Sequence, residues 1–248
     1  MPFTASHPAI ILPLLKRRVF SASGLIMGSM VPDFEFFLRF EANGPHGHSV
    51  WGMLWLNVPI ASLFITLYHV LVRNQMILNL PIFFRKRFAD FLEFNWIAYL
   101  KSNFFKVIIS ILVGNFSHLL WDSFTHFDGF FVTKMAFFNE EVYQIPVYSI
   151  LQYGFSLLGA LAIWSFIVKM PEVKIVNQTA IKNILGYWFM VFFITVLVYF
   201  IRYFFEDYNE FGERIVILCA GFLIGLILSS SVFNLIHPKK HLALSKDE

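Results

Sequence analysis

Three long apolar segments in the C-terminal half most constrain how this chain can fold. Residues 146–168 carry no charge, residues 184–205 carry only Arg202 near their end, and residues 215–236 are again uncharged. Each is long enough to cross a hydrocarbon core of about 30 Å as a helix, and a helix satisfies its backbone polar groups without water. The sequence therefore predicts three membrane-spanning helices in this half.

The composition extends this interpretation to the whole chain of 248 residues. Hydrophobic residues make up 58% of it and charged residues 14%, whereas soluble domains have about 45–50% and about 25%. Residues 50–72 and 104–124 read as two further spans, since Pro59 is tolerated where neighbours satisfy the freed backbone. The predicted fold class is all-α: a polytopic membrane helical bundle with five or six hydrophobic segments.

The first 48 residues contain no clean span. Residues 8–15 and 21–30 are too short to cross a bilayer and read as half-helices or a re-entrant pair, which must be covered by protein or line a cavity. Residues 73–101 are expected to form a loop, with an interfacial amphipathic helix as the alternative. Within a single membrane domain we expect residues 1–130 to carry the functional half and residues 131–248 to form the membrane anchor.

The distribution of Lys and Arg predicts the orientation in the membrane. Loops 73–103 and 169–183 and the C-terminal tail are basic, and basic loops stay in the cytoplasm. The end of the 104–124 span then lies on the outer side, together with Asp33 and His48. The net charge of +3 is small and its cations are scattered, so no nucleic-acid partner is expected.

His118, Asp122 and His126 recur at intervals of four residues at the end of this span. Each step of four advances only about 40° around a helix, so the three side chains share one face. Ionisable groups in a membrane helix are costly and therefore mark function. A further His or Asp occurs at three turn-like places in the first 48 residues, at His7, Asp33 and His48.

Imidazole and carboxylate ligands suit zinc, and also iron or manganese. The chain has one cysteine, Cys219, which cannot build a thiolate site. His126 could instead be an exposed loop histidine or a partner of a ligand, and His7 could cap the first helix. His46 is expected to be a bystander, and His69 a polar residue hydrogen-bonded within the bundle.

Four motifs in the N-terminal half resemble a known family. They are residues 2–9 around His7, residues 28–34 around Asp33, residues 47–49 around His48, and residues 117–126. Together they look like the bacterial membrane proteins grouped as domain of unknown function 4184. That group is similar in motif order to predicted membrane-bound metal-dependent hydrolases, and more distantly to zinc-dependent phospholipase C and P1-type nucleases.

The resemblance implies a phospholipase C-like metal-site core. Asp33, His48, His118 and Asp122 would form one metal site, and His7 with Asp122 would form part of a second. The phospholipase pattern continues with a further His and a His-x-x-x-Glu helix, which this sequence lacks after His126. One or two zinc ions are therefore expected rather than three.

Two functions follow as expectations. The first is a hydrolase in the bacterial inner membrane, with its C-terminus in the cytoplasm. It would act on a phosphoester or related ester, small or lipid-linked, with Asp33 or Asp122 as general base. The second is a non-enzymatic membrane protein in which the His/Asp cluster is a structural metal site or a hydrogen-bond network. Membrane lipid is the expected partner in both.

Overall fold

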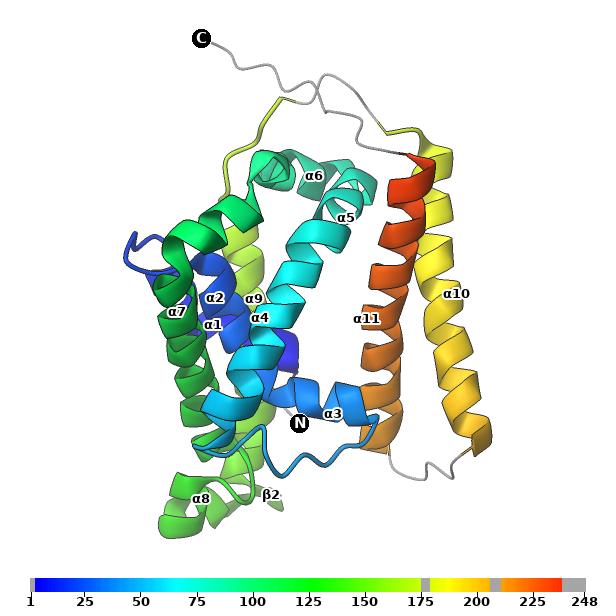
Figure 1. Ribbon diagram of the computed structural model, residues 1–248. Coiled ribbons are helices and arrows are strands. Elements are labelled where there is room, and N and C mark those ends of the chain that lie inside the picture. Colours follow the sequence, from blue (N-terminus) through cyan, green and yellow to red (C-terminus); the bar gives the residue numbers. More distant parts are fainter. Residues whose placement is uncertain (1–2, 175–178, 206–210, 238–248) are drawn as a thin grey trace. The chain divides into compact units, whose positions relative to one another are not determined.

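A computed structural model describes residues 3–174, 179–205 and 211–237 of the chain. Five of its helices are long and apolar enough to cross a membrane, and Figure 1 shows the helices in sequence colours. They are Met53–Asn79, which contains α4 (Val58–Leu67) and α5 (Arg73–Asn79), then α7 (Trp96–Thr125), α9 (Val147–Val168), α10 (Ile181–Phe205) and α11 (Phe211–Ile236). The all-α membrane fold and its five predicted spans are thereby confirmed. The C-terminal tail, residues 238–248, lies outside the described residues.

The prediction of a loop over residues 73–101 was wrong. The first long helix continues through α5, a short helix α6 (Ile82–Phe88) and a 3-10 helix (Ala89–Glu93) follow, and α7 already begins at Trp96. Charge in the triplet at 85–87 suggested a loop, but Lys and Arg are good helix formers. Charged residues therefore indicate which part of a helix lies outside the hydrocarbon core, and they do not indicate where the helix ends.

The chain divides into two compact units. One comprises Met1–Glu35, Gly44–Ile65 and Leu100–Val168, and the other comprises Phe36–Asn43, Thr66–Tyr99 and Lys169–Glu248. In the second unit α10 packs along α11, and the buried Tyr187 hydroxyl lies 2.9 Å from the Ser230 hydroxyl. The first unit contains every candidate metal ligand.

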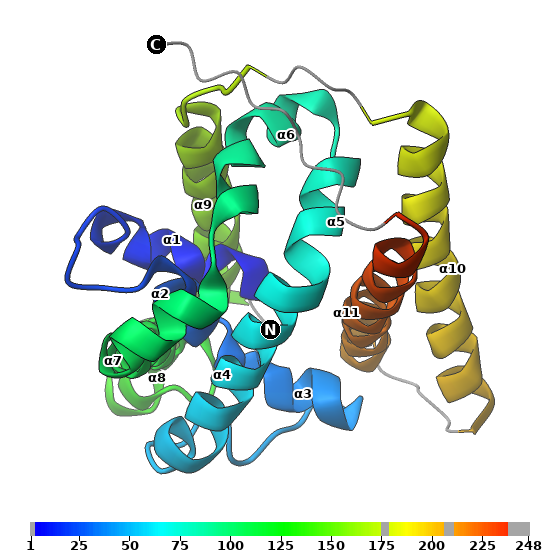
Figure 2. The ribbon, with the colours of Figure 1, turned by 45° about the horizontal axis from the view of Figure 1, so that its top comes forward.

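Short helices precede the first span, as expected from the half-helix pattern. They are α1 (Pro8–Ile11), α2 (Ala22–Gly28), a 3-10 helix (Val31–Asp33) and α3 (Phe34–Arg39). Within the first unit α1 packs on α9, and α2 lies beside α7 in Figures 1 and 2. These contacts supply the protein cover that short helices need within a membrane.

Two glycines set how closely α2 approaches α7. A Cβ atom on Gly28 would overlap the carbonyl of Ile111, and one on Gly114 would overlap the carbonyl of Leu25. The two backbones therefore meet without intervening side chains, as small residues allow between membrane helices. This close approach brings the end of α2 against the middle of α7.

The connection between α7 and α9 is folded rather than open. It contains α8 (Phe130–Lys134), a 3-10 helix (Ala136–Asn139) and a hairpin of β1 (Glu141–Val142) and β2 (Ile145–Pro146). These strands are the only ones in the part of the chain that the structure describes.

Candidate metal centre

The long helix α7 carries His118 and Asp122, one turn apart and buried. The His118 Nδ1 lies 2.9 Å from the backbone carbonyl oxygen of Ser29, at the end of α2. Because a carbonyl oxygen only accepts, Nδ1 carries a proton, and Nε2 is directed at Asp122, whose Oδ2 is 3.0 Å away. Fixing a ring by a bond from its other nitrogen is typical of metal-ligating histidines.

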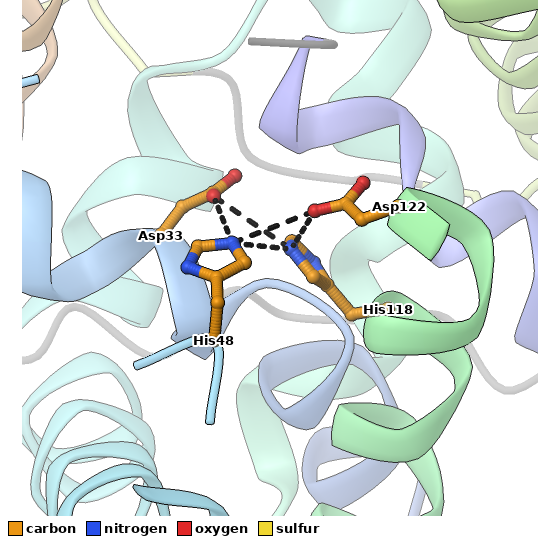
Figure 3. A group of neighbouring side chains, drawn as sticks. All are labelled: Asp33, His48, His118 and Asp122. Atoms are coloured by element: carbon orange, nitrogen blue, oxygen red, sulfur yellow. Dashed lines mark hydrogen bonds and ion pairs between the residues drawn. The ribbon is translucent and has the colours of Figure 1, made fainter. Parts of the chain in front are cut away.

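Asp33 and His48 complete a group of four ligand atoms (Figure 3). One ligand atom from each of these four residues lies within 4.8 Å of the other three. The separations that involve a histidine are His48–His118 3.3 Å, His48–Asp33 3.3 Å, His48–Asp122 3.4 Å, His118–Asp33 3.6 Å and His118–Asp122 3.0 Å.

These five separations, 3.0–3.6 Å, are close to those between the ligands of one metal ion. Ligands at about 2.0–2.1 Å from a tetrahedral zinc ion lie about 3.3–3.4 Å from one another. Two imidazole nitrogens and two carboxylate oxygens are also the donor types that zinc accepts. Asp33, His48, His118 and Asp122 could therefore hold a metal ion.

The second carboxylate oxygen of Asp122 faces a different pair of histidines. Asp122 Oδ1 lies 3.1 Å from His7 Nε2 and 3.4 Å from His126 Nδ1. His7 is buried and stacks on His118, with ring centroids 3.9 Å apart, while its Nδ1 lies 3.2 Å from the Thr4 carbonyl oxygen. All four candidate histidines thus converge on Asp122, whose Oδ2 faces His48 and His118 and whose Oδ1 faces His7 and His126.

The charges of the cluster support one another. Burial lowers the pKa of His48, but hydrogen bonds to Asp122 and Asp33 outweigh this effect and raise its pKa to about 9. Burial raises the pKa of Asp33, but the charge of His118 and a hydrogen bond from His48 outweigh it and hold that pKa below its usual value. Without a metal ion, a histidine with the pKa of His48 is protonated at neutral pH. The His48 cation then lies between the carboxylates of Asp33 and Asp122.

His126 differs from the other candidates in its environment. It follows the last residue of α7 and its side chain is 23% exposed. Burial lowers its pKa, against the opposing charge of Asp122. Its ring is therefore neutral at physiological pH, which is the form that binds metal.

Two other histidines have different surroundings. The ring of His46 faces Trp55 with centroids 5.4 Å apart. His69 stacks on Trp96 and its Nδ1 lies 3.2 Å from Arg73 Nη1. Neither belongs to the group of four ligand atoms.

Sequence reasoning missed the groups that hold the ligands in place. The Thr4 hydroxyl donates to Asp33 Oδ2 at 2.5 Å. The buried Glu35 carboxylate accepts the backbone N–H groups of His46, at 3.0 Å, and of Gly47, at 2.5 Å. From the other side, Asn57 Nδ2 donates to the Gly47 carbonyl at 2.7 Å.

The loop that presents His48 is therefore clamped through its backbone. A Cβ atom on Gly47 would overlap the Pro32 carbonyl, so glycine is needed for this approach. The one signal in the sequence was an acidic residue, Glu35, in the apolar run 34–38. A backbone carbonyl such as that of Ser29 leaves no trace in sequence.

Comparison with known proteins agrees with the motif pattern. The family model described as domain of unknown function (DUF4184) matches residues 1–231, which include every candidate ligand. Neither the curated proteins nor the solved structures include one that matches this chain.

Proposed function

The chain belongs to the DUF4184 family, and from its His/Asp cluster we propose that it is a membrane-bound metal-dependent hydrolase. The observation that supports this proposal best is the group of four ligand atoms from His48, His118, Asp33 and Asp122, with the second oxygen of Asp122 facing His7 and His126. The proposed reaction is hydrolysis of a phosphoester or related ester. The metal is zinc, one ion or two, with iron or manganese as alternatives.

The two halves of the cluster differ in how many ligands they offer. Asp33, His48, His118 and Asp122 Oδ2 fill four positions, as in structural zinc sites. A second ion held by His7, His126 and Asp122 Oδ1 would have three protein ligands, and catalytic zinc sites keep three protein ligands and an open fourth position. We assign the substrate to this second side. A zinc ion bound there would lower the pKa of a bound water to about 7.

Asp33 is the better candidate for general base. Both oxygens of Asp122 face histidines, so neither is free to take a proton. Asp33 Oδ2 contacts no histidine among the described interactions and accepts from the Thr4 hydroxyl. Asp33 Oδ2 could therefore accept a proton while Oδ1 remains a ligand, and the Thr4 hydroxyl holds that carboxylate in position.

Buried polar atoms near the centre favour a binding site. Neither amide atom of Asn115, which lies on the His118 face of α7, has a hydrogen-bond partner in the described structure, and the Trp121 indole N–H beside His7 also lacks one. Each such atom costs about 1–3 kcal/mol unless water or a ligand satisfies it. A polar substrate group or its water would supply the missing partners.

The membrane setting favours a lipid-linked substrate, although a small phosphoester remains within the proposal. His118 and Asp122 lie in the last two turns of a helix long enough to span the bilayer, which favours a centre at one membrane face. The basic loops favour the outer face for it, with the protein in the inner membrane and its C-terminus inside.

The second candidate is a structural role, favoured by the four-ligand side and by the raised pKa of His48. Four protein ligands can close a zinc site completely. Without metal, a protonated His48 joins Asp33 to Asp122 as a salt-bridge network. In either form the cluster would hold the short N-terminal helices on α7 without catalysis.

Metal analysis combined with turnover tests the proposal. Wild-type protein in nanodiscs should contain at least one zinc per chain, and His118→Ala or Asp122→Ala should lose it. His46→Ala is the matched control, since His46 lies two residues from His48 but outside the cluster. His126→Ala should retain the first metal and lose phosphoester turnover. Wild-type protein without stoichiometric metal would exclude the hydrolase, and metal without turnover of any ester offered would favour the structural role.

A further inference from the structure

The segment between α7 and α9 exposes an unusual number of large apolar side chains. Six of them lie within residues 127–143: Phe127, Phe130, Met135, Phe137, Val142 and Tyr143. Phe127 is 73% exposed and Tyr143 is 96% exposed. Exposed groups of large apolar side chains mark surfaces that meet protein or membrane.

This surface is held in place by the fold. Two Phe-Phe pairs, Phe130-Phe131 and Phe137-Phe138, each send one ring inward and one outward. The inner rings pack on Phe124 at the end of α7, with centroids 4.3 Å and 6.0 Å away. Asn139 Nδ2 donates to the Val132 carbonyl at 2.7 Å and ties the two pairs together.

The hairpin presents its aromatic residue at a conformational cost. Tyr143 and Gln144 form the two-residue turn between β1 and β2, with φ of 52° and 64°. Such turns favour Asn and Gly because φ is positive at both positions, and an aromatic residue there is an outlier. The strain points to a role for Tyr143 outside the fold of the hairpin itself.

We infer that residues 127–145 form a membrane anchor that lies in the boundary between lipid headgroups and acyl chains. Both neighbours, α7 and α9, are long and apolar enough to span the bilayer, so the segment begins and ends at the membrane surface. Aromatic side chains are enriched at this depth. The anchor continues the lipid-facing surface of the two spans.

The charges of the segment indicate what attracts it to the bilayer surface. It carries Asp128, Glu140 and Glu141 against Lys134, so anionic headgroups would repel it. Its attraction to the interface comes from apolar and aromatic area. The anchor therefore prefers a zwitterionic surface to an anionic one, and salt does not release it.

The anchor also sets the depth of the metal centre. His126 is followed at once by Phe127, and the Asp122 carbonyl accepts the backbone N–H of His126 at 3.1 Å. Rings buried in the headgroup layer at 127 and 130 place His126 at the same depth. The placement itself does not require that the centre be catalytic.

Spin-label accessibility in phosphatidylcholine proteoliposomes tests the inference. On a Cys219→Ala background, Tyr143→Cys and Phe137→Cys are labelled. Arg17→Cys serves as the control, because residues 16–18 are basic and exposed. The ratio of oxygen to nickel-chelate accessibility should be severalfold higher at 143 and 137 than at 17, and unchanged at high salt. Monodisperse elution and native helicity establish that each variant is folded.

Two outcomes would overturn the anchor. Accessibility to the nickel chelate equal to that at residue 17 would place the segment in water. Protection from both reagents, with spin–spin broadening between copies, would assign the surface to a second copy of the chain.

Discussion

Glu35 provides the sharpest quantitative test of how the site is built. Its Oε2 accepts both the His46 and the Gly47 backbone N–H, so one atom fixes the loop that presents His48. Hydrogen bonds to a charged acceptor contribute about 1.5–3 kcal/mol each, and neutral ones about 0.5–1.5 kcal/mol. Glu35→Gln keeps the shape and an acceptor oxygen but removes the charge.

The expected loss follows from these two bonds. Replacing two charge-assisted bonds by neutral ones costs about 2–3 kcal/mol. If the full amount appears in zinc binding, affinity falls about 30- to 150-fold, since 1.4 kcal/mol is tenfold. Glu35→Ala should cost more, because it leaves two buried N–H groups without an acceptor.

Competition with a chelator of known affinity measures the effect on detergent-solubilised protein. Glu41→Gln is the matched control, because Glu41 is exposed and pairs with Arg39 instead. Circular dichroism and monodispersity check that each variant is folded. Wild-type zinc affinity in both Glu35 variants would refute the claim that this carboxylate positions His48.

Three further predictions address the ligands, the proton and the helix packing. Asp122→Asn should reduce zinc affinity by more than about 100-fold, beyond the 10- to 100-fold typical of groups behind the ligands, and chelator competition checks this. Because the raised pKa of His48 keeps its proton up to pH about 9, zinc binding at pH 7.5 should release at least one proton. The apparent affinity should then rise at least about tenfold per pH unit and level off above pH 9; calorimetry in buffers of different ionisation enthalpy measures the release, and a pH-independent affinity would contradict it. Gly114→Ala should destabilise the protein by about 1–3 kcal/mol and lower its metal content, because a Cβ there would lie 2.7 Å from Ser29 N. Gly154→Ala, where nothing lies within 4 Å, should lower neither thermal stability nor metal content.

The spans could be predicted because a membrane-crossing helix needs about 20 mostly apolar residues in one continuous stretch of the sequence. Each of the five spans is an apolar run read without knowledge of its neighbours. The shared face of His118, Asp122 and His126 was equally local, since helical spacing alone places them together. Family resemblance then suggested their N-terminal partners.

What could not be predicted depends on contacts between distant residues or on backbone atoms. His7 meets Asp122 across 115 positions, and no periodicity states which carboxylate oxygen it will face. The Ser29 carbonyl fixes the His118 ring, and every residue has a carbonyl. The charged triplet at 85–87 misled for a different reason, because helix propensity and membrane depth are separate properties.

The bond from His118 to the Ser29 carbonyl also bears on the order in which this protein is made. The two residues are 89 positions apart, and α2, at seven residues, is far too short to enter hydrocarbon alone. During synthesis the short N-terminal helices must therefore wait at the bilayer surface until α7 has been inserted. Assembly of the ligands then follows the insertion of α7, and capture of a metal ion would hold the short helices against it.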